Sequence, residues 1–323
     1  MAKKIFITGA TGFIGSHLCE MAAKKGFNVV GFDRYNPNND HGWLNKNNYK
    51  NLKIILGDIR DYDSVHKSMK GCKIVFHLAA LGGIPYSYYS PAAYVKTNIE
   101  GTYNVLESAK NLKVNSTIIT STSEVYGSAK YIPMDESHPL NAQSPYAASK
   151  VAADQLALSY FNSYNLPIKI IRPFNTYGPR QSNRAVIPRI INQCLLNKKS
   201  INLGNLKPTR DFNYVEDVCK AYFEILKNKQ LNGEIINVGS NTNISIGNLA
   251  KVIMKITGKK IKIIQKNKIM RPKKSEVENL KCNNKFLKRN TRWSSNYNLI
   301  EGLKKTIKWM DKNKKTFKNE YQI

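Results

Sequence analysis

The stretch that decides the fold is Lys4-Ile-Phe-Ile-Thr8-Gly9-Ala-Thr-Gly12-Phe-Ile-Gly15. Its first five residues form the apolar run of a short buried strand, and a helical pattern follows the last glycine. Gly9 and Gly12 let backbone N–H groups approach a pyrophosphate at the helix N-terminus, and Gly15 lets the helix pack closely on the strand. Strand, glycine turn and helix therefore stand in the order that a dinucleotide site requires.

An acidic residue follows the next strand. Residues 28–32 predict that strand, and Asp33 stands at its end, eighteen residues beyond Gly15. A carboxylate at this place accepts hydrogen bonds from both ribose hydroxyls of NAD and repels a 2′-phosphate. Arg34 beside it softens that preference. The sequence thus predicts NAD as the cofactor.

Further apolar runs repeat the strand pattern. Residues 52–57 predict a third strand, and we expect Asp58 and Ile59 after it to bracket an adenine. Residues 72–80 predict a fourth strand that ends in Leu78-Ala-Ala80, where small side chains leave room for a cofactor.

Helical stretches separate the strands along the chain. A helix is predicted from about residue 91 to 113, a fifth strand at 115–120 and a sixth ending near 171, while the Asn-rich residues 37–48 read as a loop. This alternation predicts an α/β fold with a Rossmann-type, doubly wound parallel sheet.

A candidate acid/base pair lies in Ser144-Pro-Tyr146-Ala-Ala-Ser-Lys150. The Ser-Pro start predicts a helix, on which residues four apart lie one above the other. The ammonium of Lys150, with a nicotinamide ring nearby, is expected to lower the pKa of Tyr146 from about 10 towards working pH. Such a Tyr takes a hydroxyl proton while hydride leaves the same carbon. The same spacing also occurs by chance on many helices.

The net charge of +29 in 323 residues raises a nucleic-acid or membrane hypothesis. Forty-one of the 51 basic residues are Lys, which favours a solvated lysine-rich surface over a nucleic-acid footprint. Five arginines fall within forty residues, where we expect recognition of an anion. These are Arg172, Arg180, Arg184, Arg189 and Arg210.

The remaining composition favours the cytoplasm. The five cysteines are scattered without a CxxC pair, so they predict neither a disulfide framework nor a metal site. No apolar run approaches the roughly 18 residues that span a membrane, and the glycine turn interrupts the N-terminal apolar run too early for a signal peptide.

Seven features of this chain follow one another as they do in a known family. They are GxxGxxG, Asp33, Asp58, the Leu-Ala-Ala strand end, Asn98, Ser121-Thr-Ser-Glu-Val-Tyr-Gly127 and the Tyr/Lys pair. In this order they resemble the extended short-chain dehydrogenase/reductases of the nucleotide-sugar epimerase/dehydratase family. The resemblance implies an NAD-binding domain at 1–175, to which 210–240 return. It implies a smaller C-terminal α/β domain for the nucleotide sugar at 176–209 and 241–323. It further implies a homodimer packed through the helices near 91–113 and 144–165.

The family's catalytic triad carries over to Thr122, Tyr146 and Lys150. In the family's 4,6-dehydratases an Asp-Glu pair follows the Thr, whereas this chain has Ser123 and Glu124. The resemblance implies that Glu124 is the base at C5 and leaves the acid at C6 open between Glu124 itself and a relay through Ser123. Nucleotide-sugar decarboxylases share this motif.

The resemblance also implies binding residues, numbered here in this chain. The cofactor set is Gly9, Thr11, Gly12, Phe13, Ile14, Gly15, Asp33, Arg34, Asp58, Ile59, Leu78, Ala79, Ala80, Asn98, Ser121, Tyr146, Lys150 and Pro173. The substrate set is Gly83, Ile84, Thr122, Asn175, Arg184, Val186, Leu203, Arg210, Arg271 and Glu276.

Longer phrases narrow the resemblance. Gly83-Ile-Pro-Tyr-Ser-Tyr88, Arg172-Pro-Phe-Asn-Thr-Tyr-Gly and Pro208-Thr-Arg-Asp-Phe-Asn-Tyr214 resemble the nucleotide-GlcNAc 4,6-dehydratases that open legionaminic acid biosynthesis. This implies GDP-GlcNAc as substrate, with UDP-GlcNAc next. A UDP-glucuronate decarboxylase, which needs an Arg facing the sugar carboxylate, and a nucleotide-sugar 4-epimerase stay open. An idle NAD-binding or nucleic-acid-binding protein is the alternative from another class.

Overall fold

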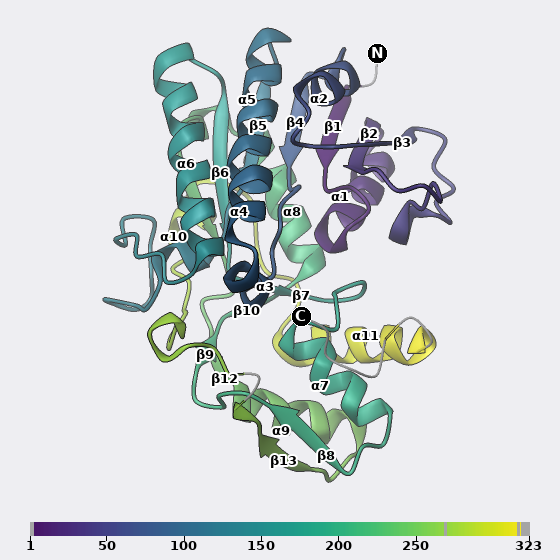
Figure 1. Ribbon diagram of the computed structural model, residues 1–323, viewed down its shortest axis with the longest axis vertical. Helices are drawn as coiled ribbons and strands as arrows, with labels where there is room; N and C mark the ends of the chain where they lie inside the picture. The colour runs from purple at the N-terminus through teal and green to yellow at the C-terminus, as the bar shows by residue number, and fades with distance from the viewer. Residues whose placement is uncertain (1–2, 268–269, 315–316, 318–323) are drawn as a thin grey trace.

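The computed structural model describes residues 3–267, 270–314 and 317, and centres on one parallel sheet (Figure 1). Its seven strands run in the order β11-β6-β5-β4-β1-β2-β3. Strand β1 lies inside the sheet, where Ile5 pairs with Val29 on one side and Ile74 on the other. The strands are β1 (Lys4–Thr8), β2 (Asn28–Arg34), β3 (Leu52–Gly57), β4 (Ile74–His77), β5 (Ser116–Thr120), β6 (Ile168–Pro173) and β11 (Ile235–Val238).

Helices cover both faces of this sheet, as the alternating pattern predicts. On one face, α1 (Phe13–Lys24) and α8 (Val215–Lys227) pack over a core that includes Ile7 and Phe76. On the other, α2 (Tyr62–Met69), α5 (Gly101–Asn111) and α6 (Pro145–Tyr164) enclose a second core around Phe6. The doubly wound α/β fold is therefore confirmed.

The single helix predicted at 91–113 is wrong in detail. After α3 (Ile84–Tyr89), the chain forms α4 (Pro91–Tyr94), a π-helical segment Val95–Glu100, and then α5. The wide segment carries Asn98, whose buried side chain is held by hydrogen bonds to Leu81 and Ser149. A π segment of this kind is frequent at functional sites.

The stretch 37–48 is more ordered than the predicted loop. It contains the short 3₁₀ turn Gly42–Leu44, in which Leu44 is buried in the sheet core. Trp43 meets the edge of Trp309 with ring centroids 5.2 Å apart. Leu44 and Trp43 hold the segment against the sheet and against Trp309, because burial of these apolar side chains outweighs the polar composition around them.

A smaller α/β region lies below the main sheet (Figure 1). Its core gathers Ile190, Ile201, Leu249 and Leu303, contributed by helices and one strand. Its elements are α7 (Val186–Leu195), α9 (Ile246–Thr257), α11 (Leu299–Lys312) and the parallel strands β8 (Ser200–Leu203) and β13 (Lys262–Gln265). The smaller C-terminal region is thus as predicted.

Several short elements complete the fold. They are β7 (Asn175–Tyr177) paired with β10 (Phe212–Tyr214), β9 (Thr209–Arg210) paired with β12 (Ile244–Ser245), the 3₁₀ turns Lys229–Leu231 and Lys273–Ser275, and α10 (Lys285–Asn290). The boundaries at 175, 209 and 240 stay a proposal. Leu287 and Trp293, assigned above to the C-terminal domain, pack in the core beneath α8 and β11.

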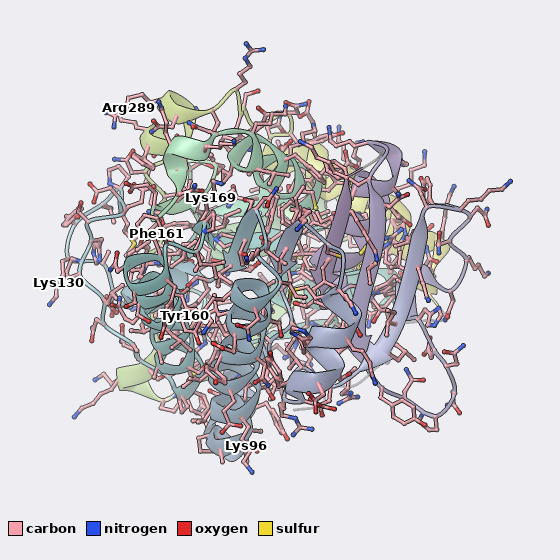
Figure 2. The ribbon with its side chains drawn as sticks, turned by 90° about the horizontal axis from the view of Figure 1, so that it is seen from above. Lys96, Lys130, Tyr160, Phe161, Lys169 and Arg289 are labelled. Atoms are coloured by element: carbon pink, nitrogen blue, oxygen red, sulfur yellow. The ribbon has the colours of Figure 1, made fainter. Side chains whose placement is uncertain are left out.

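Most lysines reach solvent, but Lys150 and Lys169 are buried. Figure 2 shows Lys96, Lys130 and Arg289 at the edge of the molecule, whereas Lys169 lies inside. Lys169 is only 1% exposed. The lysine-rich composition is therefore mainly, though not wholly, a property of the surface.

The five cysteines are free and buried, as expected of small core residues. Within the described residues, no group of His, Cys, Asp and Glu is arranged to hold a metal ion. None of the helices described is both long and apolar enough to cross a bilayer.

Candidate active site

The glycine turn between β1 and α1 admits no side chains at two positions. Gly9 has φ of +67°, and a Cβ there would stand 2.9 Å from the backbone nitrogen of Ala79. A Cβ on Gly15 would stand 1.9 Å from the carbonyl oxygen of Gly9. The turn therefore approaches both β4 and its own helix more closely than any other residue type permits.

The start of α1 is open. Gly12 is exposed at the N-cap, no side chain caps the helix, and its first turn holds no acidic residue. The first N–H groups of α1 are thus suited to a pyrophosphate. Phe13 and Ile14 are half-buried and pack their side chains on the sheet core, which leaves their backbone at the turn.

Asp33 closes the other side of this turn. Its Oδ2 accepts hydrogen bonds from Thr11 N at 2.7 Å and Thr11 Oγ1 at 2.8 Å, and its Oδ1 accepts from Arg34 N. The Arg34 side chain is exposed. A carboxylate held at the end of β2, next to an uncapped helix start, fits the ribose and pyrophosphate of a dinucleotide.

The end of β4 is fixed by a buried polar chain. Thr8 Oγ1 accepts from the backbone nitrogens of Leu78 and Ala79 and bonds to His77 Nδ1 at 2.8 Å. His77 Nε2 continues the chain to Thr102 Oγ1 at 3.0 Å. Ala80 beyond them is exposed, so the strand end opens to the cofactor side without a bulky side chain.

Three residues predicted to bind the cofactor already have partners within the chain. Asp58 pairs with Arg60 at 2.5 Å, which lowers the pKa of that carboxyl, and Ile59 is buried against Gly101. Asn98 is 1% exposed, and its side-chain amide forms hydrogen bonds with the backbone of Leu81. Asn98 therefore shapes the site from behind.

The predicted acid/base pair converges at the end of β5. Lys150 is buried, and its Nζ donates to the carbonyl oxygen of Thr120 at 2.6 Å. Tyr146 lies one turn earlier on α6, with its ring 6.2 Å from that of Tyr94. Thr122 lies beside the Tyr146 hydroxyl and interacts with it by hydrogen bonding. Thr122, Tyr146 and Lys150 therefore lie close together at the end of β5.

The expected low pKa of Tyr146 is wrong for the chain alone. Burial raises the pKa of Tyr146 well above its ordinary value, and the charges of Glu124 and Asp154 raise it further. The Thr122 side chain opposes this only in part. Burial also lowers the pKa of Lys150. The sequence argument counted the favourable charge and missed the loss of hydration.

Glu124 lies in a group of four charges. It follows Thr122 in the 3₁₀ turn Ser123–Tyr126, where its backbone nitrogen donates to Thr122 Oγ1. Its Oε2 is 3.5 Å from Arg271 Nη1, and Arg210 pairs with Glu276 at 3.3 Å. Residues predicted for the diphosphate and ribose therefore gather around the predicted base. Ser123 is buried next to Glu124.

The remaining predicted substrate residues spread along the same side. Asn175 has a buried Oδ1 that accepts no hydrogen bond from the described residues, so it is free to accept one from a sugar. Arg184 is exposed and Val186 opens α7. Leu203 is 2% exposed in the core of the C-terminal region, so its side chain cannot meet a ligand.

Pro173, Gly83 and Ile84 hold backbone positions around the site. Pro173 is buried at the end of β6, opposite Val238 of β11. Gly83 caps α3 and its carbonyl accepts a hydrogen bond from Tyr94, while Ile84 is nearly buried. Each contributes through its main chain.

The expected anion role of the arginine cluster is wrong for two members. Arg172 is fully buried and pairs with Asp154 at 3.0 Å, and Arg180 pairs with Glu20 at 2.9 Å. Sequence reasoning missed Asp154 altogether. Its position four residues after Lys150 was the available signal, because that spacing puts both on one helix face.

The fold agrees with comparisons against known proteins. The sequence pattern of the family described as GDP-mannose 4,6 dehydratase matches residues 6–306. The chain belongs to this family. Its relatives there include dehydratases, epimerases and decarboxylases that act on nucleotide sugars.

Three of these relatives illustrate the range. The chain is 36% identical over 272 residues to the dTDP-D-glucose 4,6-dehydratase of Dictyostelium discoideum, covering 79% of this chain and 62% of that protein. It is 35% identical to the UDP-N-acetyl-alpha-D-glucosaminuronate decarboxylase of Bacillus cytotoxicus, covering 96% and 98%. The UDP-glucuronic acid 4-epimerase of Bacillus cereus, solved with UDP-glucuronic acid and NAD, superposes with a TM-score of 0.88 at 30% identity, covering 96% and 99%. The cofactor bound in that structure is the one that the glycine turn and Asp33 predict.

Proposed function

We propose that this protein is an NAD-dependent nucleotide-sugar 4,6-dehydratase that acts on a nucleotide-activated N-acetylglucosamine, GDP-GlcNAc before UDP-GlcNAc, for legionaminic-type sialic acid synthesis. The observation that supports it best is the convergence of Thr122, Glu124, Tyr146 and Lys150 at the end of β5. An acid/base Tyr and a separate buried carboxylate are the two groups that an oxidation followed by an elimination requires.

The chain's own residues divide the work. Tyr146 takes the proton of the C4 hydroxyl, and the Lys150 ammonium favours the resulting phenolate. When bound, NAD would supply the acceptor for hydride from C4 and the donor of hydride to C6, held by the start of α1 and Asp33. Glu124 removes the C5 proton, which the carbonyl at C4 makes acidic. The C6 hydroxyl leaves as water with a proton that Glu124 returns or Ser123 relays.

The residues present suit the cofactor and the substrate. The uncapped start of α1 and the Asp33 carboxylate receive the pyrophosphate and ribose of NAD. Arg210 and Arg271 offer two guanidinium groups for the sugar diphosphate, and Asn175 offers a free acceptor. The homodimer that the family resemblance implies is not needed for any of these contacts.

A second candidate is a nucleotide-sugar decarboxylase. That reaction shares the C4 oxidation but needs an arginine that faces a carboxylate on the sugar. Arg271, 3.5 Å from Glu124, is the residue that favours it. A decarboxylase releases carbon dioxide and produces no loss of water.

The test separates the two by product mass. The purified protein is incubated separately with GDP-GlcNAc, UDP-GlcNAc and UDP-glucuronate, and the product masses are measured by mass spectrometry. We expect loss of water from a GlcNAc nucleotide. In deuterated solvent, Glu124→Gln should stop both water loss and deuterium entry at C5, whereas Glu107→Gln, a carboxylate on α5 paired with Lys110, should leave both unchanged. Water loss at the wild-type rate in Glu124→Gln refutes the role of Glu124, and loss of carbon dioxide from UDP-glucuronate alone supports the decarboxylase.

A further inference from the structure

The lysine of the acid/base pair stands in a buried group of charges. Lys150 is 3% exposed, and Asp154 lies one turn further along α6 with no exposed surface. Residues i and i+4 lie on one helix face, so the carboxylate and the ammonium point to the same side. Burial lowers the pKa of Lys150 and raises that of Asp154, and each charge opposes part of the shift in the other: Asp154 raises the pKa of Lys150, while Arg172 and Lys150 lower that of Asp154.

Asp154 is anchored from two strands. Its Oδ2 accepts hydrogen bonds from Ser121 Oγ at 2.7 Å and Arg172 Nε at 3.1 Å, and Arg172 Nη2 lies 3.0 Å away. Its Oδ1 accepts no hydrogen bond from any residue that the structure describes, although it is fully buried. A buried carboxylate with a bare oxygen is costly for folding, so stability alone does not explain why the site holds it.

The surroundings of Lys150 otherwise disfavour its charge. His77 on β4 is neutral, because burial and Lys150 itself lower its pKa to about 3. Arg172 on β6 is a second cation. Glu124, which follows β5, and Tyr94 on α4 act on Tyr146. Asp154 is the carboxylate among the described residues whose charge favours the ammonium of Lys150.

We propose that Asp154 is a positioning residue that keeps Lys150 in its ammonium form, and that Arg172 balances it so that a single net positive charge stands behind Tyr146. The inference rests on the acid/base role proposed above for Tyr146 and Lys150. Asp154 touches neither substrate nor cofactor and acts only through Lys150 and the field at Tyr146.

Substitution of either partner should move the pH–rate profile in opposite directions. Asp154→Asn keeps the side-chain shape and removes the negative charge, so both Lys150 and Tyr146 should lose protons at lower pH. Both limbs of the profile should shift down by about one pH unit or more, the usual effect of a charge at this range. Arg172→Gln leaves Asp154 uncompensated and should shift both limbs up. The double variant Asp154→Asn/Arg172→Gln should lie within about half a unit of wild type, because the opposite charges are removed together.

A second measurement does not depend on turnover. The phenolate absorbance of Tyr146 is titrated in the NAD complex, where the positive charge of the nicotinamide favours the phenolate, as the difference between a protein and its Tyr146→Phe counterpart. With Asp154→Asn this difference curve should move to lower pH. It tests the charge arrangement even if no nucleotide sugar is converted, so its failure is distinct from failure of the proposed function.

The proposal is overturned if Asp154→Asn lowers kcat with unmoved limbs and an unmoved Tyr146 titration, since that is the behaviour of a purely structural residue. Shifts of the same sign in Asp154→Asn and Arg172→Gln also overturn it. Where a single variant does not fold because one buried charge is left unpaired, the double variant decides: a shift of more than about one unit from wild type contradicts the balance of charges.

Discussion

Replacement of Lys169 by Met should stabilise the protein. Burial lowers the pKa of Lys169 from 10.5 to about 8, and its Nζ has one hydrogen bond, to Ser116 Oγ at 3.3 Å. The difference of about 2.5 between the pKa values of the unfolded and folded chain corresponds to about 3 kcal/mol of destabilisation near neutral pH. The substitution also removes the hydrogen bond to Ser116, which lowers the free energy of unfolding by about 1 kcal/mol. Met has a similar length and no charge, so the free energy of unfolding should rise by about 2 kcal/mol.

The pH dependence fixes the sign of this prediction. The pKa of Lys169 is lower in the folded chain than in the unfolded chain. Between about pH 8 and about pH 10.5 the unfolded chain therefore binds more protons at this residue. The free energy of unfolding of the wild type should rise as pH rises through that window. The gain should vanish in Lys169→Met.

Urea unfolding at pH 7 and pH 9.5 measures the effect of this substitution. Lys96→Met is the matched control, because Lys96 is exposed (Figure 2) and its replacement should change stability by less than about 0.5 kcal/mol. The reasoning is refuted if Lys169→Met is less stable than wild type at pH 7, or if the stability difference between the two is the same at both pH values.

Three further substitutions test the site itself. Tyr146→Phe should lower kcat about a hundredfold or more while cofactor content stays unchanged, and more than a few per cent residual activity would mean that another group is the base. Asp33→Ala removes the acceptor of Thr11 and of the ribose and should weaken NAD binding about tenfold by calorimetry, a result that equal affinities would contradict. Gly15→Ala places a Cβ 1.9 Å from the carbonyl oxygen of Gly9, so the purified variant should retain about a tenth or less of the NAD; full retention would show that the turn adapts.

The sequence predicts the sheet well because each strand is a local signal. The apolar runs of β1 and β5 are buried on both faces, and such strands read as short continuous apolar segments, while the run at 52–57 forms the partly buried edge strand β3. The glycine turn is local in part, since Gly15 meets Gly9 within one strand–helix unit, whereas Gly9 meets Ala79 beyond the end of β4. Boundaries between helical types were not predictable, and the π segment around Asn98 depends on contacts with distant Leu81 and Ser149.

The site was predicted in kind but not in its charge pairing. Residue types and spacing indicate that Tyr146 and Lys150 share a helix face, and nothing in that pattern shows how much water they lose on folding. The buried partner of Asp154 is Arg172, on a strand that follows α6, and the pair exists only once β6 lies beside that helix. The sequence therefore does not show that burial raises the pKa of Tyr146 in the chain alone.

The same limit governs the choice of substrate. Two arginines and two glutamates face the site as pairs, Arg271 with Glu124 and Arg210 with Glu276. A sugar diphosphate brings negative charge that competes with both glutamates for these guanidinium groups, and a diphosphate that engages Arg271 leaves Glu124 unpaired and able to act as a base. A uronate brings a further carboxylate at C6, which competes for the same arginine at the reacting end. The position of Arg271 in the substrate complex thus distinguishes elimination from decarboxylation, and it depends on a balance of charges that motif spacing does not encode.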